Sequence, residues 1–227
     1  MTSRVPDFKG ANILANEILV ASRDIVSFPV QVKKVIKEWT DIQVRSFAKA
    51  KAYGIDIEAF GSKSAVIHCI HGRYIIFYNQ NDFQPRVKFS ILHEFGHYQM
   101  QHNLKVTSIE LYGKYEVEAN CFAAQILMPE QVINELKIRG AVVNKTFLIR
   151  YFGVSEEAAE KRLETLGKYQ SEWRTEEEKM FDEAILFKYE GFMDKILPKK
   201  NEYNWFDDEN DMQYQRDRWD FSIRNRY

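Results

Sequence analysis

One short stretch decides the fold, residues 93–97, which read His93-Glu94-Phe95-Gly96-His97. On a helix, positions i and i+4 lie on one face, so the two imidazoles can grip a single ion. Glu94 lies at the edge of the same face, where it can take a proton from a water molecule on that ion. This HExxH pattern predicts a Zn²⁺ site in which His93 and His97 are ligands and Glu94 is the catalytic base.

The sequence before this stretch favours a buried helix. Residues 87–92, VKFSIL, are apolar on one side. The alternative is a surface helix that carries two unrelated histidines. Burying two histidines and a glutamate without a metal to bind is costly, so the context favours the metal site.

A third ligand must come from elsewhere in the chain. A metzincin would place a histidine six residues after His97, but that residue is Asn103, and the expected glycine is Met100. His102 falls off the ligand face, and we interpret it as a helix-end histidine or one that supports the site from outside. A glutamate from the following helix is the other common solution. The candidates are Glu110, Glu116 and Glu118.

Composition excludes several classes of protein. The 227 residues are 45% hydrophobic and 14% aromatic, which excludes wholesale disorder. Charged residues make up 29% with a net charge of -1, which disfavours a generally basic nucleic-acid binder. Two cysteines are too few for a disulfide scaffold or a four-cysteine zinc site. Residues 1–10 contain no apolar leader segment and no apolar run is long, so we expect a soluble, cytoplasmic protein without a membrane span.

The hydrophobic period predicts an α+β fold. Residues 11–22 carry a helical stripe, a second helix follows Pro29, and residues 41–52 are expected to be helical. Residues 55–60, 64–71 and 73–80 alternate or are β-branched, which predicts a small, largely antiparallel three-stranded sheet. After residue 86 the patterns are helical. They cover residues 87–101, 117–127, a helix opened by Pro129, 146–152, 155–166 and a capping-box helix from Thr175 to Leu197.

The chain divides into three predicted parts. Residues 1–130 form a metallopeptidase domain, residues 131–168 a helical subdomain like a helix-turn-helix, and residues 169–227 a C-terminal extension. The extension is acidic, with 15 Asp and Glu against 10 Lys and Arg from residue 170, yet it holds three of the four tryptophans. We therefore expect it to dock on the body or on a regulatory partner rather than to act as a linker.

A second motif carries a family resemblance. Residues 116–129, EVEANCFAAQILMP, resemble the E-x-E-A-N-x-F-A signature of the ImmA/IrrE family of metallo-endopeptidases. The stretches 86–97 and 149–168 are also similar to that family, so the resemblance covers roughly residues 11–168. It implies a zincin-like fold with active-site helices, a Zn²⁺ cofactor, and a zinc site completed by the glutamate of the E-A-N triplet, Glu118.

Helix geometry agrees that only one glutamate of the second motif serves as a ligand. Glu116 and Glu118 are two residues apart and therefore about 200° apart around the helix axis. Glu118 shares a face with Phe122 and Gln125, and we prefer it to Glu116. Cys121 is interpreted as a small buried thiol rather than a ligand.

The resemblance implies a narrow function. Members of the family resemble antirepressor proteases that cleave helix-turn-helix repressors of mobile elements or stress regulons. This chain is accordingly expected to hydrolyse a protein substrate, such as a helix-turn-helix repressor. Residues 73–79 offer a strand edge for that substrate, and Tyr98 and Tyr112 are candidates to stabilise the oxyanion.

Two alternatives stay open. Residues 147–168 scan as a helix-turn-helix, but the second helix sets Glu156, Glu157, Glu160 and Glu164 against few basic residues, which disfavours direct nucleic-acid binding. The other alternative is a non-catalytic regulatory or interaction protein, of toxin–antitoxin or phage type, that retains a zincin-like site. In either case the extension is a candidate control element.

Overall fold

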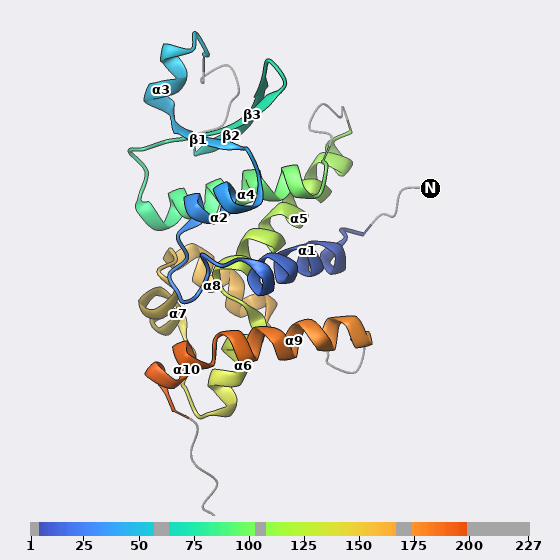
Figure 1. Cartoon of the computed structure of the whole chain (residues 1–227), viewed down its shortest axis with the longest axis vertical. Coiled ribbons are helices and arrows are strands. Elements are labelled where there is room, and N and C mark those ends of the chain that lie inside the picture. Colours follow the sequence, from blue (N-terminus) through green and yellow to red (C-terminus); the bar gives the residue numbers. More distant parts are fainter. Residues whose placement is uncertain (1–4, 57–63, 103–107, 167–173, 199–227) are drawn as a thin grey trace, which may run out of the picture. The chain divides into compact units, whose positions relative to one another are not determined.

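The computed structural model describes residues 5–56, 64–102, 108–166 and 174–198. Within them a three-stranded sheet lies against a set of helices, which confirms the α+β class (Figure 1). The strands are β1 (Gln43–Ser46), β2 (Ala65–Ile70) and β3 (Arg73–Tyr78). The helices are α1 (Phe8–Ala21), α2 (Val32–Trp39), α3 (Phe47–Ala52), α4 (Gln84–Gln99), α5 (Ile109–Leu127), α6 (Glu130–Ile138), α7 (Lys145–Phe152), α8 (Glu156–Thr165), α9 (Glu176–Lys188) and α10 (Glu190–Ile196). None of the helices in these ranges has both the length and the apolar character that crossing a bilayer requires.

The sheet has the order β1-β3-β2. β2 and β3 form the predicted antiparallel hairpin, turning at His71 and Gly72, which both have positive φ. β1 runs parallel to β3, so one of the two pairings is antiparallel and the other is not. The three-stranded sheet is thus confirmed, but its remaining strand is residues 43–46, which the sequence predicted to be helical. The strand expected at 55–60 is not formed at residues 55 and 56, and its other residues lie outside the described ranges.

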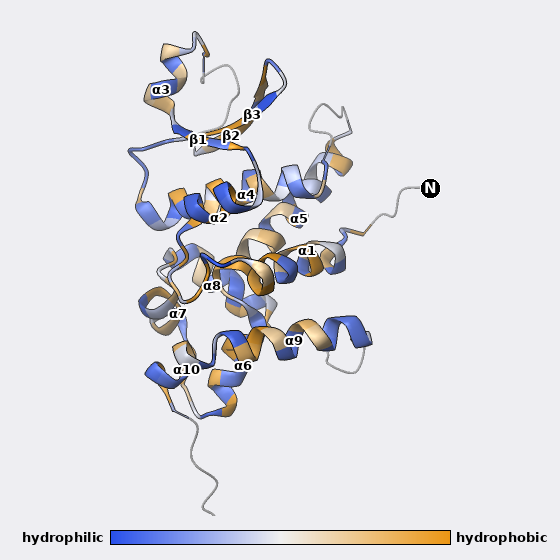
Figure 2. Cartoon of the chain, in the orientation of Figure 1, coloured by the Kyte–Doolittle hydropathy of each residue, from blue (hydrophilic) through white to orange (hydrophobic). Residues whose placement is uncertain are grey.

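Both faces of the central strand are covered. Ile76 belongs to the main core, whereas its neighbours Ile75 and Phe77 face a second, smaller core that also contains Ala50 of α3. The period of two explains this division, because successive strand residues point to opposite faces. Helix α4 packs against β2 and β3 (Figure 1). The hydrophobic colouring of Figure 2 runs along the hairpin strands and over parts of the helices packed around them.

Turn and cap residues determine where the later helices begin and end. Gly153 joins α7 to α8 with φ 64°, and a Cβ there would lie 2.6 Å from Pro29 Cγ, so only glycine fits. The Ser155 hydroxyl accepts from the Ala158 N–H and caps α8. Thr175 and Glu178 form the predicted capping box of α9. These residues fix where the C-terminal helices begin.

The first part of the predicted extension packs on the body. The helix expected to run to Leu197 is instead divided into α9 and α10 at Tyr189, whose buried hydroxyl donates to the Leu19 and Ile25 carbonyls. Helix α9 also contacts α1 and α6, and the described residues up to Leu197 belong to one compact unit. Residues 169–173 and 199–227 of the extension lie outside the described ranges.

Helices α4 and α5 approach each other closely at one glycine. A Cβ on Gly96 would lie 2.9 Å from Phe122 Cδ1 and 3.3 Å from Ala119 Cα. The fully buried rings of Phe95 and Phe122 pack edge to face beside this point, with centroids 5.9 Å apart. Because Gly96 lies between Phe95 and His97, its close contact sets how near α5 comes to the histidine face.

We predict that Gly96→Ala lowers the free energy of unfolding by about 1–3 kcal/mol, because the added methyl group must displace Phe122. Gly113→Ala is the matched control, since Gly113 lies in α5 with nothing within 4 Å of a Cβ. That substitution should be neutral or stabilise by up to about 1 kcal/mol. Urea unfolding of both variants measures the difference. Equal effects of the two substitutions would contradict the close contact.

Candidate metal centre

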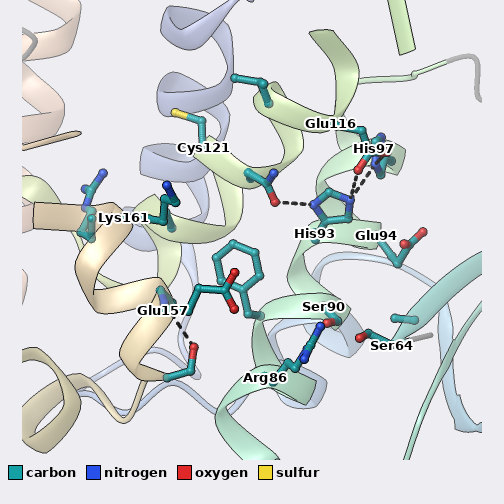
Figure 3. Close-up of a pocket in the computed structure, with 18 of the residues that line it drawn as sticks. Ser64, Arg86, Ser90, His93, Glu94, His97, Glu116, Cys121, Glu157 and Lys161 are labelled. Carbon is teal, nitrogen blue, oxygen red and sulfur yellow. Dashed lines mark hydrogen bonds and ion pairs between the residues drawn. The ribbon is translucent and has the colours of Figure 1, made fainter. Parts of the chain in front are cut away.

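The two histidines of the motif meet on the face of α4 that turns towards α5. His93 Nε2 and His97 Nε2 are 3.0 Å apart. The His97 side chain is 2% exposed and that of His93 is 15% exposed. Figure 3 shows both rings directed at the same point. The structure therefore brings together the two ligands that the i, i+4 spacing predicts.

The third group at this point is Glu116. Its two carboxylate oxygens lie 3.3 Å from His93 Nε2 and 3.3 Å from His97 Nε2 (Figure 3). Among the described residues, His93, His97 and Glu116 are the set of three whose ligand atoms all lie within 4.8 Å of one another. The sequence-based preference for Glu118 over Glu116 is corrected here, because the structure does not bring Glu118 to the histidine pair.

Glu118 instead points into the core side of α5. Its side chain is 4% exposed; His102 Nε2 lies 2.9 Å from Oε2, and the Asp7 N–H donates to Oε1 over 2.5 Å. The face it shares with Phe122 and Gln125 is the buried face, since all three residues are buried. Glu116 lines the cleft, whereas Glu118, about 200° further around the axis of α5, does not.

A signal for Glu116 was present in the sequence. Asn120 is four residues after Glu116, so the two side chains share one face of α5. In the structure Asn120 Oδ1 lies 2.9 Å from His93 Nδ1. A polar i, i+4 pair outside the apolar face of α5 therefore marks the surface that meets α4.

The chemistry of these groups fits a zinc ion. The Nδ1 atoms of both imidazoles already have hydrogen-bond partners, Asn120 for His93 and His102 for His97. With Nδ1 protonated, each neutral ring presents a lone pair at Nε2, and the carboxylate of Glu116 only accepts. Three acceptors that converge repel one another unless a cation lies among them, and two imidazoles with one carboxylate are an established zinc ligand set.

Burial and charge shift the pKa values of the acidic groups in opposite directions. Burial raises the pKa of Glu94 to about 7, an effect that nearby His93 and a hydrogen bond from the Ile67 N–H only partly offset. In the metal-free protein, hydrogen bonds that His93 and His97 donate hold the pKa of Glu116 well below its usual range despite its partial burial. Glu116 is therefore ionised at neutral pH, whereas Glu94 is poised to exchange a proton.

Burial and neighbouring charges also shift the pKa values of two histidines. Burial acts to lower the pKa of His93, but the hydrogen bond with Glu116 and the charges of Glu94 and Glu116 outweigh it, so the pKa is raised. For His102, burial and the neighbouring His97 lower the pKa against the attraction of Glu118.

A cleft of about 1300 Å³ opens onto the histidines. Its walls come from β2, α4, α5 and α8, with Ser64, Arg86, Glu157 and Lys161 on the walls beyond the histidines (Figure 3). Residues 73–79, expected to offer a strand edge, are ruled out for that role because β3 is the central strand. The edge that faces the cleft is β2, whose residues Ala65 to His68 line it.

Helix α8 belongs to the wall of the cleft. Arg162 is buried and donates to the Met128 carbonyl over 2.9 Å, which holds α8 against the end of α5. Ala158, Lys161 and Thr165, one turn apart along α8, line the cleft with Arg162. The helix of the predicted helix-turn-helix that would read DNA thus directs this side towards the histidines rather than outward.

The two tyrosines and the cysteine considered in the sequence analysis differ in their relation to the cleft. Tyr112 lines the cleft, whereas Tyr98 packs edge to face on Tyr74 and does not line it. Burial raises the pKa of the Cys121 thiol to about 11, and its sulfur donates weakly to Asn12 Oδ1. Cys121 is therefore a protonated thiol at neutral pH.

Comparison with known proteins places the histidines in a family context. Residues 50–164, just over half of the chain, match the model of the peptidase M78 family, described as the IrrE N-terminal-like domain. A Bacillus phage phi105 protein, "uncharacterized immunity region protein 2", is 36% identical over 70 residues, covering 29% of this chain and 44% of that protein. A Mycobacterium tuberculosis transcriptional regulator of known structure aligns with a TM-score of 0.49 and 15% identity, over 71% of this chain and 48% of that one. The chain thus spans less than half the length of either relative.

The raised pKa of Glu94 predicts a pH-dependent stability of the metal-free protein. Because the folded state holds this proton more tightly than the unfolded state, the free energy of unfolding falls as pH rises from about 4.5 to about 7. Glu94→Gln carries no such penalty and should be more stable than wild type above about pH 7, by at most about 3 kcal/mol. Below about pH 4.5 the difference should vanish. Thermal unfolding of both chelator-treated proteins across this range is the measurement, and a variant equally destabilised at every pH would refute the shift.

Proposed function

We propose that this chain is a zinc-dependent endopeptidase, because it belongs to the peptidase M78 family, which is described as the IrrE N-terminal-like domain. The family is one of zinc-dependent peptidases. The observation that carries the proposal for this chain is the convergence of His93, His97 and Glu116 at the floor of a cleft that Glu94 also lines. That arrangement has the parts that metal-assisted hydrolysis of a carbonyl-containing bond requires.

His93, His97 and Glu116 would hold the zinc ion. When bound, zinc supplies Lewis-acid chemistry, since it polarises a carbonyl group and lowers the pKa of a water molecule. The zinc ion carries two positive charges, Glu116 carries one negative charge and the two imidazoles are neutral. The occupied site would therefore have a net charge of +1. Asn120 holds the ring of His93 in the orientation that turns Nε2 towards the site.

Glu94 is assigned the proton transfers. Its carboxylate accepts a hydrogen bond from the Ile67 N–H over 2.9 Å, which fixes the side chain against β2. A carboxyl group with a pKa of about 7 takes a proton from a water molecule and returns it to the leaving amine with little driving force lost in either step. Zinc would lower that pKa through its positive charge, which favours the basic form at neutral pH.

The substrate would lie along β2. A strand at the edge of a sheet presents backbone donors and acceptors to an extended peptide, and β2 is the edge strand that lines the cleft. Tyr112 stands across the cleft beside Glu116, and burial with nearby Glu116 raises the pKa of its hydroxyl, so the hydroxyl stays protonated. We assign Tyr112 the role of hydrogen-bond donor to the developing oxyanion.

We further propose that the substrate is a helix-turn-helix transcriptional repressor of a mobile element or stress regulon. The similarity of residues 116–129 to the ImmA/IrrE signature supports this class of substrate. So does the relative whose name refers to a phage immunity region. Cleavage of such a repressor would make the protein an antirepressor that acts in the cytoplasm, where the repressor binds DNA.

We predict that the purified protein binds about one zinc per chain and that Glu116→Ala weakens zinc binding by more than about 100-fold, beyond the loss expected for a group outside the ligand set. Glu118→Ala should still bind about one zinc at high protein concentration. Metal analysis by mass spectrometry after dialysis measures both. Loss of zinc from Glu118→Ala with full retention in Glu116→Ala would overturn the assignment of Glu116.

We also predict that zinc-loaded wild type cleaves at least one helix-turn-helix repressor encoded in its source genome, and that Glu94→Gln is slower by about 10²- to 10⁴-fold. The experiment co-expresses the protein with each such repressor and follows cleavage by mass spectrometry. Glu110→Gln is the control, because Glu110 is exposed in the first turn of α5. Zinc-loaded protein that cuts neither these repressors nor a proteome-derived peptide library would refute the peptidase proposal.

A further inference from the structure

A chain of buried side chains leads away from the candidate ligand His97. His97 Nδ1 lies 2.9 Å from His102 Nδ1, and His102 Nε2 lies 2.9 Å from Glu118 Oε2. The side chains of the three residues are only 2%, 3% and 4% exposed. Water therefore does not satisfy these polar atoms, and they must satisfy one another.

The end of α4 brings His102 to this position. Gln101 adopts a left-handed conformation with φ 54°, its N–H donates to the Tyr98 carbonyl, and the His102 N–H donates to the His97 carbonyl over 3.0 Å. These two bonds form a Schellman motif, which folds the chain back over the last turn of the helix. His102 consequently lies against His97 although it is five residues later in the chain.

Other contacts hold the outer members in place. The ring of His102 stacks on Tyr115 with centroids 4.2 Å apart and an interplanar angle of 14°. Glu118 Oε1 accepts from the N–H of Asp7, the N-cap residue of α1, and Lys114 Nζ lies 3.7 Å from the same oxygen. These two contacts hold Oε1 in place, while the other oxygen, Oε2, meets the His102 ring.

Hydrogen-bond polarity along the chain has a consequence for His97. A carboxylate only accepts, so His102 Nε2 carries a proton. One proton lies between the two Nδ1 atoms. If His102 supplied it, His102 would be a cation and a neutral His97 would carry its own proton on Nε2, where it would block a metal. If His97 supplies it, His102 is neutral and His97 Nε2 keeps the lone pair that a metal needs.

We propose that His102 and Glu118 are positioning residues, which hold the imidazole of His97 in the orientation and tautomer that bind zinc through Nε2. The inference rests on the proposed zinc site and deepens it. Glu118, expected from the sequence to be a ligand, acts on the site through two histidine rings. Groups that hold the second nitrogen of a ligand histidine raise its basicity and reduce the freedom it loses when the metal binds.

The first test measures zinc affinity by competition with a chelating dye, without any substrate. His102→Phe keeps an aromatic ring for Tyr115 to stack on but removes the acceptor, and it should weaken zinc binding by about 10- to 100-fold. His102→Asn places an amide oxygen near the former Nδ1, accepts from His97, and should restore affinity to within about threefold of wild type. Glu118→Leu should resemble His102→Phe, and exposed Glu110→Gln should match wild type.

A purely structural role gives a different pattern. In that case affinity would follow the thermal stability of the metal-free variants, and His102→Asn would be no better than His102→Phe. Equal zinc affinity of wild type, His102→Phe and Glu118→Leu would also overturn the proposal. Failure of the proposed peptidase function would look different from failure of this proposal. In that case wild type would bind no zinc or, when zinc-loaded, would cut no protein.

A second measurement on wild type does not depend on whether any variant folds. Nitrogen-15 spectra of the imidazoles in the zinc-loaded protein should show His102 neutral with its proton on Nε2 and His97 with its proton on Nδ1. The signals are assigned in wild type itself, by through-bond correlation of each ring with its own backbone amide. A proton on Nδ1 of His102, or on both of its nitrogens, would overturn the proposal.

Discussion

The close approach of α4 and α5 at Gly96 is the constraint on which the rest of the site depends. Neither helix holds a complete ligand set: α4 carries His93 and His97, and α5 carries Glu116. Gly96 has no side chain, so α4 packs closely on Ala119 and Phe122 of α5, and the 3.3 Å contacts form beside this point. A well-packed apolar contact thus determines the geometry of a polar site, which is why the motif has a glycine beside its second histidine.

That geometry concentrates polar groups where they are costly to bury. His97, His102 and Glu118 are almost fully removed from solvent, and Glu94 is driven towards its neutral form. Hydrogen bonds offset this cost, because each of these buried groups has a partner elsewhere in the fold: the Ile67 N–H of β2 for Glu94, and His102 for both His97 and Glu118. The site is therefore preorganised: its side chains are held by the fold before any ion or substrate binds.

The motif residues and most helices were predictable because local patterns determine them. The i, i+4 spacing of His93 and His97 and the caps at Ser155 and Thr175 specify geometry within one or two turns. The choice between Glu116 and Glu118 was not local, since it depends on which face of α5 meets α4. Glu118 shares a face of α5 with Phe122, which favoured it as a ligand from the sequence, but that face is buried and its carboxylate meets His102 instead. Strand β1 was missed for a similar reason, because residues 43–46 are a strand only through pairing with β3.

The position of α8 in the cleft wall divides the side chains of this helix into two groups. Ala159 and Arg162 anchor the helix in the core, whereas Glu157 and Lys161 on the cleft side are exposed. Exposed positions tolerate substitution at small cost in stability, usually within about 0.5 kcal/mol. In the proposed peptidase, the exposed side chains of α8 that a substrate would meet and the groups of α4 and α5 that are assigned the chemistry lie on separate segments of the chain. Under the proposed function, a few side chains of α8 could be exchanged to suit a different substrate without altering the groups of α4 and α5.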